Sequence, residues 1–208
     1  MESIPETDKQ ELPVGPRILL AASGSVAAIK FENLCRTFME WGEVRAVVTK
    51  SSLHFIDKSA LPSSVILYTD DDEWSSWKKI GDDVLHIELR KWADILVIAP
   101  LSANTLAKVS FQTLVLNAIL DFLCSWVAIP TGKIAGGLCD NLLTCIVRAW
   151  DFSKPLYVAP AMNTSMLNNP FTRRHLNTIG ELGASLLPPI TKSLLAAIMA
   201  MAQWPNLL

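Results

Sequence analysis

The chain has 208 residues, half of them hydrophobic, and a formal net charge of -2. This length suits a single α/β domain with a sizeable core. Because Lys and Arg are scattered and the charge balance is nearly neutral, we expect no nucleic-acid partner.

The N-terminal stretch, residues 1–16, is polar, acidic and contains Pro. It lacks the apolar core of a signal peptide, so it predicts a disordered N-terminal arm on a cytoplasmic protein. The cysteines show no paired metal-ligand spacing, so we expect reduced thiols and no metal site. The four cysteines are Cys35, Cys124, Cys139 and Cys145.

The first half of the chain alternates apolar runs with amphipathic stretches. In chain order, these predict a strand at 17–23, a helix at 26–41, a strand at 43–51, a short helix at 52–60 and a strand at 64–70. In the first helix, the apolar positions at helical spacing are Ile29, Leu34, Phe38 and Trp41.

The second half continues the alternation, and residues 84–93 fit either a helix or an extended segment. The further elements expected are a strand at 94–100 ended by Pro100, a helix at 136–150, a strand at 154–163, a helix at 169–183 opened by Pro170 and closed by Gly183, and a strand at 184–189. Continuous apolar strands separated by helices indicate a parallel sheet covered on both faces.

Three predicted strand ends carry small polar residues where ligands of parallel sheets bind. Ser102, Asn104 and Thr105 offer donors and acceptors at one of them. Any one such tip is more often an ordinary helix cap, but three on one edge favour ligand binding. The three tips are residues 22–28, 99–105 and 159–164.

The first tip has the features of a phosphate cradle. Gly24 permits a tight turn, Ser25 supplies a hydroxyl, and the amides of Ser25 and Val26 begin a helix whose N-terminus favours an anion. The stretch is not a GxGxxG fingerprint, so a mononucleotide is favoured over a dinucleotide.

Two further polar residues have both a chemical and a structural interpretation. His86, in the apolar "VLHIEL", could serve as general base or acid, although a lone histidine is more often a core or surface residue. The Asn163 amide, at the end of a strand, could bind a carboxylate or carbonyl; alternatively it caps the next helix.

Several motifs in sequence order resemble one family, from about Arg17 to Lys192. They are "LLAASGSVAAIKF", "TKSSLHF", "LYTDDDEW", "VLHIELRKWADILVIAPLSANTLAK", "IAGGLCDNLLTCIVRAWD" and "VAPAMNT". Together they resemble the flavin-dependent cysteine decarboxylases, and more narrowly the plant-type phosphopantothenoylcysteine decarboxylases, also described as halotolerance proteins.

The resemblance implies a flavodoxin-like Rossmann fold assembled as a homotrimer, with FMN near the subunit interface. The implied reaction is the loss of CO2 from 4'-phosphopantothenoylcysteine to give 4'-phosphopantetheine, a step of coenzyme A synthesis. FMN would oxidise the thiol towards a thioaldehyde, which serves as the electron sink for CO2 loss, and would then return the electrons.

The resemblance also assigns roles by motif. His86 would be the catalytic base and Asn163 would bind the substrate carboxylate. After "PAMN", the family motif continues with Met and Trp. Met166 matches it here, but Leu167 replaces the Trp, which weakens substrate positioning. The residues expected to hold FMN are Gly24, Ser25, Val26, Thr49, Ser51, Ser102, Ala103, Asn104, Thr105 and Ala161.

An apolar insert at 109–133 separates "SANTLAK" from "IAGGLCDN", which are continuous in the family. A membrane span is disfavoured because polar residues interrupt it and it has barely the minimum length. Since Lys-Val-Ser can be encoded by AAG-GTG-AGT, it looks like retained intron sequence, in preference to a natural insertion. The helix would then either restart near Ile134 or leave the flavin site distorted.

The tail at 193–208 replaces a family segment, "RLACGDYGNGAMAEPS", that carries the catalytic cysteine. Deleting one nucleotide from the Arg codon of that segment reproduces the tail. No cysteine here lies in the matching motif, so the resemblance implies that FMN binds but turnover is impaired.

Two other function classes remain open. One is a non-catalytic flavin-binding regulator of the phosphatase or halotolerance type, although this chain lacks the long acidic extensions of the fungal relatives. The other is a different flavin protein, such as a peptidyl-cysteine decarboxylase or a prenyl-flavin transferase. The motifs "VLHIELRKWAD" and "PAMN" favour cysteine decarboxylation.

Overall fold

The computed structural model describes residues 15–187 except 77, 80 and 111–138. Its centre is one parallel sheet of six strands, in the order β3-β2-β1-β4-β5-β6. This order reverses between β1 and β4, as in a doubly wound Rossmann sheet. The strands are β1 (Arg17–Ala22), β2 (Glu43–Val48), β3 (Ile66–Tyr68), β4 (Ile95–Leu101), β5 (Leu156–Pro160) and β6 (Ser185–Leu186).

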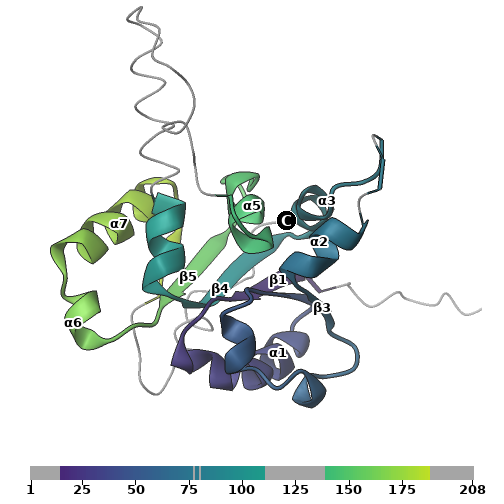
Figure 1. Cartoon of the computed structure of the whole chain (residues 1–208), viewed down its shortest axis with the longest axis horizontal. Coiled ribbons are helices and arrows are strands. Elements are labelled where there is room, and N and C mark those ends of the chain that lie inside the picture. Colours follow the sequence, from purple (N-terminus) through teal and green to yellow (C-terminus); the bar gives the residue numbers. More distant parts are fainter. Residues whose placement is uncertain (1–14, 77, 80, 111–138, 188–208) are drawn as a thin grey trace, which may run out of the picture.

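Helices cover both faces of the sheet, with α1 on one side and α2, α3, α5 and α7 on the other (Figure 1). The expected three-layer, flavodoxin-like α/β fold is therefore confirmed. The helices are α1 (Phe31–Met39), α2 (Asp70–Ser76), α3 (Leu85–Trp92), α5 (Leu142–Arg148), α6 (Thr164–Leu167) and α7 (Pro170–Glu181), and residues 103–110 are also helical. Three short 3-10 turns are η1 (Val26–Lys30), η2 (Ser52–His54) and η3 (Lys58–Ala60).

Two apolar cores lie on the two sides of the sheet because alternate residues of each strand face opposite ways. From β1, Ile18 and Leu20 join the core under α1, whereas Leu19 joins the core under α3, α5 and α7. Both cores are contiguous and contain fully buried side chains. The near-continuous apolar strands are thus explained by burial on both faces.

The helix expected at 26–41 differs at its start. Residues Val26–Lys30 form the 3-10 turn η1, and the α-helix begins only at Phe31. A 3-10 turn repeats every three residues, so it does not continue the apolar stripe of α1. As a result Ile29, expected on the core side, is 64% exposed, while Leu34 and Phe38 are buried.

Helix α2 was not predicted, and local capping explains it. The carboxylate of Asp72 accepts hydrogen bonds from the backbone N–H of Thr69 (2.6 Å) and from its hydroxyl (2.7 Å). Four acidic residues then occupy the first turn, where negative charge favours the helix dipole. A short strand β3 therefore passes directly into a helix.

Other boundaries also shift from those expected. Pro100 does not end β4, which continues to Leu101, and the Ala99–Pro100 peptide bond is cis. The helix expected over 136–150 begins at Leu142 because Asn141 is extended and caps it. Of the two alternatives for residues 84–93, the helix is confirmed: it is α3. The short helix expected at 52–60 is instead the two 3-10 turns η2 and η3. The helix closed by Gly183 is confirmed, with φ of 94° at that glycine.

An ion pair fixes the entry into the sheet. The Asp94 carboxylate accepts hydrogen bonds from the Arg17 backbone N–H (3.0 Å) and from its guanidinium (2.8 and 3.1 Å). The hydrogen bond to Arg17 holds the pKa of Asp94 below its usual value. The start of β1 is thus tied to the turn that precedes β4, its neighbour in the sheet.

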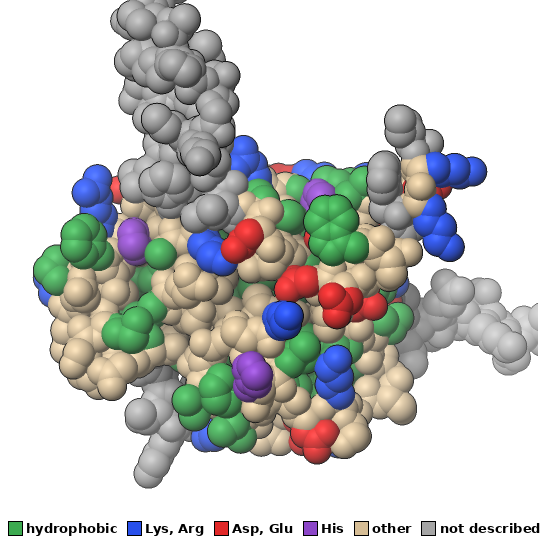
Figure 2. Space-filling view, viewed as in Figure 1, with side chains coloured by type: hydrophobic (Ala, Val, Ile, Leu, Met, Phe, Trp, Pro, Cys, Tyr) green, Lys and Arg blue, Asp and Glu red, His purple; other side chains and the backbone are tan. Residues whose placement is uncertain are grey.

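The surface in Figure 2 carries scattered Lys and Arg side chains, and acidic side chains gather near the start of α2. Within the part of the chain that the structure describes, no helix is both long and apolar enough to cross a membrane. The predictions about the N-terminal arm up to residue 14, the insert beyond Ser110 and the tail at 193–208 lie outside the described residues, as does Cys124.

Candidate functional site

The site is built at the carboxyl edge of the sheet, where β1 and β4 diverge. Ser23, which follows β1, is fully buried. Its hydroxyl donates to the Pro100 carbonyl (3.1 Å) and accepts from the Ser102 backbone N–H (2.7 Å). This one side chain therefore joins the tips of the two central strands at the point where ligands of doubly wound sheets bind. The sequence interpretation did not single out Ser23, because its role depends on the strand order.

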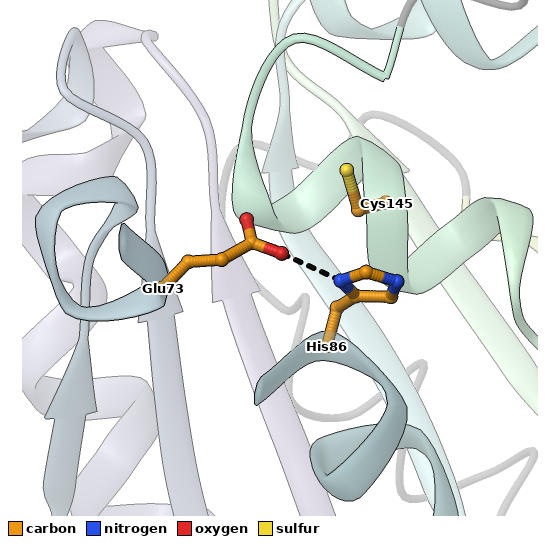
Figure 3. Close-up of side chains that lie close together, drawn as sticks. All are labelled: Glu73, His86 and Cys145. Carbon is orange, nitrogen blue, oxygen red and sulfur yellow. Dashed lines mark hydrogen bonds and ion pairs between the residues drawn. The ribbon is translucent and has the colours of Figure 1, made fainter. Parts of the chain in front are cut away.

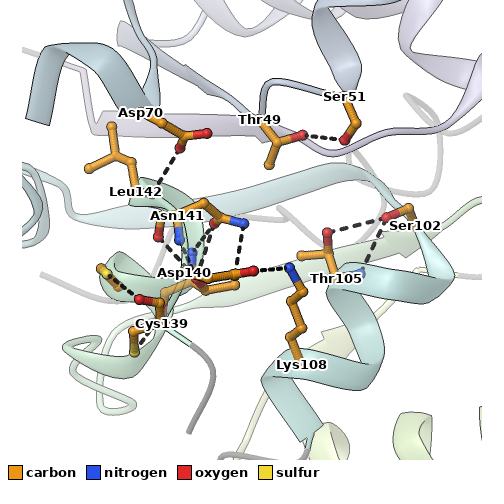
Figure 4. A network of polar contacts seen from close by, with 12 residues as sticks. Thr49, Ser51, Asp70, Ser102, Thr105, Lys108, Cys139, Asp140, Asn141 and Leu142 are labelled. Carbon is orange, nitrogen blue, oxygen red and sulfur yellow. Dashed lines mark hydrogen bonds and ion pairs between the residues drawn. The ribbon is translucent and has the colours of Figure 1, made fainter. Parts of the chain in front are cut away.

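The loop after β1 lies against the loop after β2. A Cβ added to Gly24 would meet the Ser51 Oγ at 2.4 Å and the Ser51 Cβ at 2.7 Å. Rotating the Ser51 hydroxyl would not relieve the contact with its Cβ, so only glycine fits here without separating the loops. Beside it, the Thr49 and Ser51 hydroxyls are 3.1 Å apart (Figure 4).

The first of these loops opens into η1 and α1. The Ser25 hydroxyl accepts from the Ala27 N–H at 3.4 Å, a long capping bond. Val26 and Ala27 are exposed. This helix start therefore lies at the surface beside Gly24, as a phosphate cradle requires.

The tip after β4 is partly structural. Ser102 and Thr105 are buried; the Ser102 hydroxyl donates to the Thr105 hydroxyl (3.2 Å) and accepts from the Thr105 N–H (3.3 Å) (Figure 4). This pattern caps the helix at 103–110. Asn104 is exposed at the mouth and Ala103 is half-buried, so these two positions are accessible to a ligand.

The start of α5 forms the neighbouring wall of this edge. Asn141 and Thr144 make a reciprocal capping box. The Leu142 N–H donates to the Asp70 carboxylate at 3.0 Å, and Lys108 pairs with Asp140 (Figure 4). None of these six residues had an assigned role from the sequence; the spacing Asn141-x-x-Thr144 was the available capping signal.

His86 lies near the start of α3 and is held from α2. Its Nδ1 is 2.5 Å from the Glu73 Oε1, and the two side chains are 24% and 14% exposed (Figure 3). A carboxylate at Nδ1 leaves Nε2 as the ring nitrogen that can accept a proton. Cys145, on α5, lies beside this pair. Burial raises the pKa of the Cys145 thiol to about 12, and the charges of Glu73 and Asp140 act in the same direction.

Asn163 lies apart from His86 within one chain. Its side chain accepts from the Ser165 N–H at 2.8 Å and caps α6, as the structural interpretation predicts. Helices α6 and α3 are on opposite sides of the molecule (Figure 1). Ala161 is half-buried, and its N–H donates to the Leu101 carbonyl (2.9 Å). The predicted FMN residues therefore gather along one edge, but the predicted base and carboxylate binder do not meet.

The chemistry of this edge suits a phosphorylated ligand. It combines a position where only glycine fits, an exposed helix start and neutral hydroxyls on adjacent loops. Such donors bind a phosphate through hydrogen bonds without a dedicated cation.

Comparison with known proteins agrees with this geometry. The chain matches the Flavoprotein family over residues 6–121 and 130–208. It is 68% identical to phosphopantothenoylcysteine decarboxylase of Oryza sativa subsp. japonica over 93% of this chain and 77% of the relative. It is 65% identical to the Arabidopsis thaliana protein of the same name, over 90% and 80% of the two chains.

Solved structures give the same result. A cysteine-to-serine mutant of PPC decarboxylase complexed with pantothenoylaminoethenethiol is 64% identical, with a TM-score of 0.72 over 88% of this chain and 87% of that chain. The FMN binding protein AtHal3 is 65% identical, with a TM-score of 0.72 over 87% and 84% of the two chains. From its carboxyl-edge site and these matches, the chain belongs to the Flavoprotein family, among the phosphopantothenoylcysteine decarboxylases.

Proposed function

We propose that the chain binds FMN and acts on 4'-phosphopantothenoylcysteine as a decarboxylase whose turnover is impaired. The observation that carries the proposal is the close packing of the Gly24 loop against Ser51 at the carboxyl edge, in a chain so similar to phosphopantothenoylcysteine decarboxylases. The relatives' names supply the substrate and the cofactor.

The FMN phosphate would be held by the turn at Gly24, Ser25 and Val26. The turn is exposed at Val26 and Ala27, and the helix start favours an anion. Thr49 and Ser51 would contact the adjoining part of the nucleotide. Ala103, Asn104 and Ala161 would line the flavin, with Ser102 and Thr105 shaping their loop from beneath.

His86 would be the base of the reaction. Bound FMN supplies a two-electron oxidant, and oxidation of a thiol to a thioaldehyde releases protons that need an acceptor. Glu73 supports this role because its carboxylate, 2.5 Å from Nδ1, orients the imidazole and leaves Nε2 as the acceptor.

A complete site would need neighbouring copies of the chain in a homotrimer. The separation of α3 from α6 supports this, since Asn163 could then bind the substrate carboxylate beside the His86 of another copy. Exposed Val26 (65%), in the proposed phosphate turn, and Ile29 (64%), just after it, offer apolar surface for such a contact. Asn163 is exposed and can rotate, at the cost of its cap.

We infer impairment from residues 193–208, which stand where the family has its cysteine segment. Without its proton donor, the enethiol formed by CO2 loss would not be reduced to the thiol. A related PPC decarboxylase with a cysteine changed to serine is seen with pantothenoylaminoethenethiol, the kind of product this proposal expects.

The product of the unmodified chain tests the proposal. Purified protein with FMN and 4'-phosphopantothenoylcysteine should release CO2 slowly and yield an enethiol with two hydrogens fewer than 4'-phosphopantetheine. Mass spectrometry distinguishes the two products. The rice relative, assayed in parallel, is the positive control. A normal yield of 4'-phosphopantetheine would contradict impairment, whereas flavin binding without any CO2 release would favour the alternative, a non-catalytic flavin-binding regulator.

The phosphate turn gives a second expected result. Gly24→Ala should weaken FMN binding by at least about tenfold, equivalent to about 1.4 kcal/mol, because the added Cβ forces the two loops apart. Titration of flavin fluorescence measures this. Gly180→Ala is the matched control, since a Cβ there meets nothing within 4 Å and the position is helical. Equal FMN affinity in the two variants would exclude Gly24 from the cradle.

A further inference from the structure

Three side chains from three separate helices converge beside the proposed base. They are Glu73 on α2, His86 on α3 and Cys145 on α5, and one ligand atom of each lies within 4.8 Å of the other two (Figure 3). Glu73 and Cys145 are 72 residues apart in the sequence, so no local spacing indicates the cluster. Neither Glu73 nor Cys145 binds FMN or substrate in the proposed function.

The donor types suit one class of metal ion. Carboxylate oxygen, imidazole nitrogen and thiolate sulfur are the ligands of Zn²⁺, and three protein ligands with an open fourth position form a common arrangement. Donors that share one zinc lie about 3 to 4 Å apart, given metal–ligand distances of about 2.0 to 2.3 Å. Small side-chain rotations would bring the cluster to that spacing, with Glu73 and His86 moving slightly apart from their present 2.5 Å.

The charge around the cluster also favours a cation. The carboxylates of Glu73 and Asp140 both raise the pKa of the Cys145 thiol, because a thiolate there would add a further negative charge. A divalent ion would neutralise these charges and displace the thiol proton. All three ligand residues are half-buried, so an ion could enter while the surrounding helices exclude much of the water.

We propose that Glu73, His86 and Cys145 form a binding site for a thiophilic divalent cation such as Zn²⁺. A bound cation would occupy one nitrogen of the His86 imidazole. Cation binding and proton acceptance by His86 would therefore compete. The metal site itself does not depend on the decarboxylation, and its test uses binding rather than activity.

Co²⁺ provides the probe, because tetrahedral thiolate-bound cobalt has d–d absorption at longer wavelengths than flavin. The full chain with FMN, titrated with Co²⁺, should develop these bands at one ion per chain, and added Zn²⁺ should abolish them. Cys145→Ser should remove the intense bands and weaken Zn²⁺ retention in equilibrium dialysis by at least about tenfold, and Glu73→Gln should weaken it similarly.

Cys35→Ser is the matched control: Cys35 is a buried cysteine in the opposite core, and its substitution should leave the cobalt spectrum unchanged. Flavin retention in each variant reports that the domain is folded. Absence of the bands in the unmodified chain, or bands of full intensity in Cys145→Ser, would overturn the proposal. Either result would leave the proposed FMN binding and CO2 release untouched.

Discussion

His86→Asn is expected to slow CO2 release in a single turnover by about a hundred to ten thousand fold, the usual contribution of a positioned general base. Asparagine can still donate to the Glu73 carboxylate across the position of Nδ1, but it cannot accept a proton in the useful pH range. Rapid-quench measurement of labelled CO2 from FMN-loaded protein gives the rate.

The matched control for this change is His175→Asn. His175 lies on α7, is half-buried and has no assigned role, so its replacement should leave the rate within about threefold. Flavin binding should be equal in both variants, because neither histidine lies in the loops around Gly24 and Ser51. If His86→Asn releases CO2 as fast as the unmodified chain, another group is the base.

Phe31→Ala should lower the free energy of unfolding by about 3 to 5 kcal/mol. Phe31 is the largest fully buried side chain in the core under α1, and it begins that helix directly after η1. Its loss leaves a cavity between α1 and the sheet, next to the strand ends that carry the site. Urea unfolding followed by circular dichroism measures the change.

Phe171→Ala provides the comparison, since Phe171 is 71% exposed at the start of α7. It should change the free energy of unfolding by no more than about 0.5 kcal/mol. A similar effect for the two substitutions would mean that the core under α1 does not carry the stability assigned to it.

Sequence patterns predicted the layers of the fold and the edge of the sheet where the polar strand tips gather, because continuous apolar strands and polar strand tips depend on local composition. They did not predict α2, whose start depends on Asp72 capping Thr69. They placed Ile29 in the core because a helical repeat was assumed where the chain makes a 3-10 turn.

The contacts around the site depend on tertiary structure, and sequence spacing carries little information about them. Ser23 acts as a bridge only because β1 and β4 are neighbours in the sheet. Glu73 and Cys145 approach His86 only after three helices have packed on one face. Family resemblance suggested His86, but it did not suggest what holds the ring in place.

The ion pair between Lys108 and Asp140 bears on how much the length of the chain between them can vary. It joins the two sides of the stretch 111–138, and the capping box at Asn141 starts α5 without help from what precedes it. For a chain segment between fixed ends, the closure entropy costs only about 0.6 kcal/mol more each time the segment doubles in length. Alternative splicing or an engineered reporter domain at this junction should therefore be tolerated by both flanking helices.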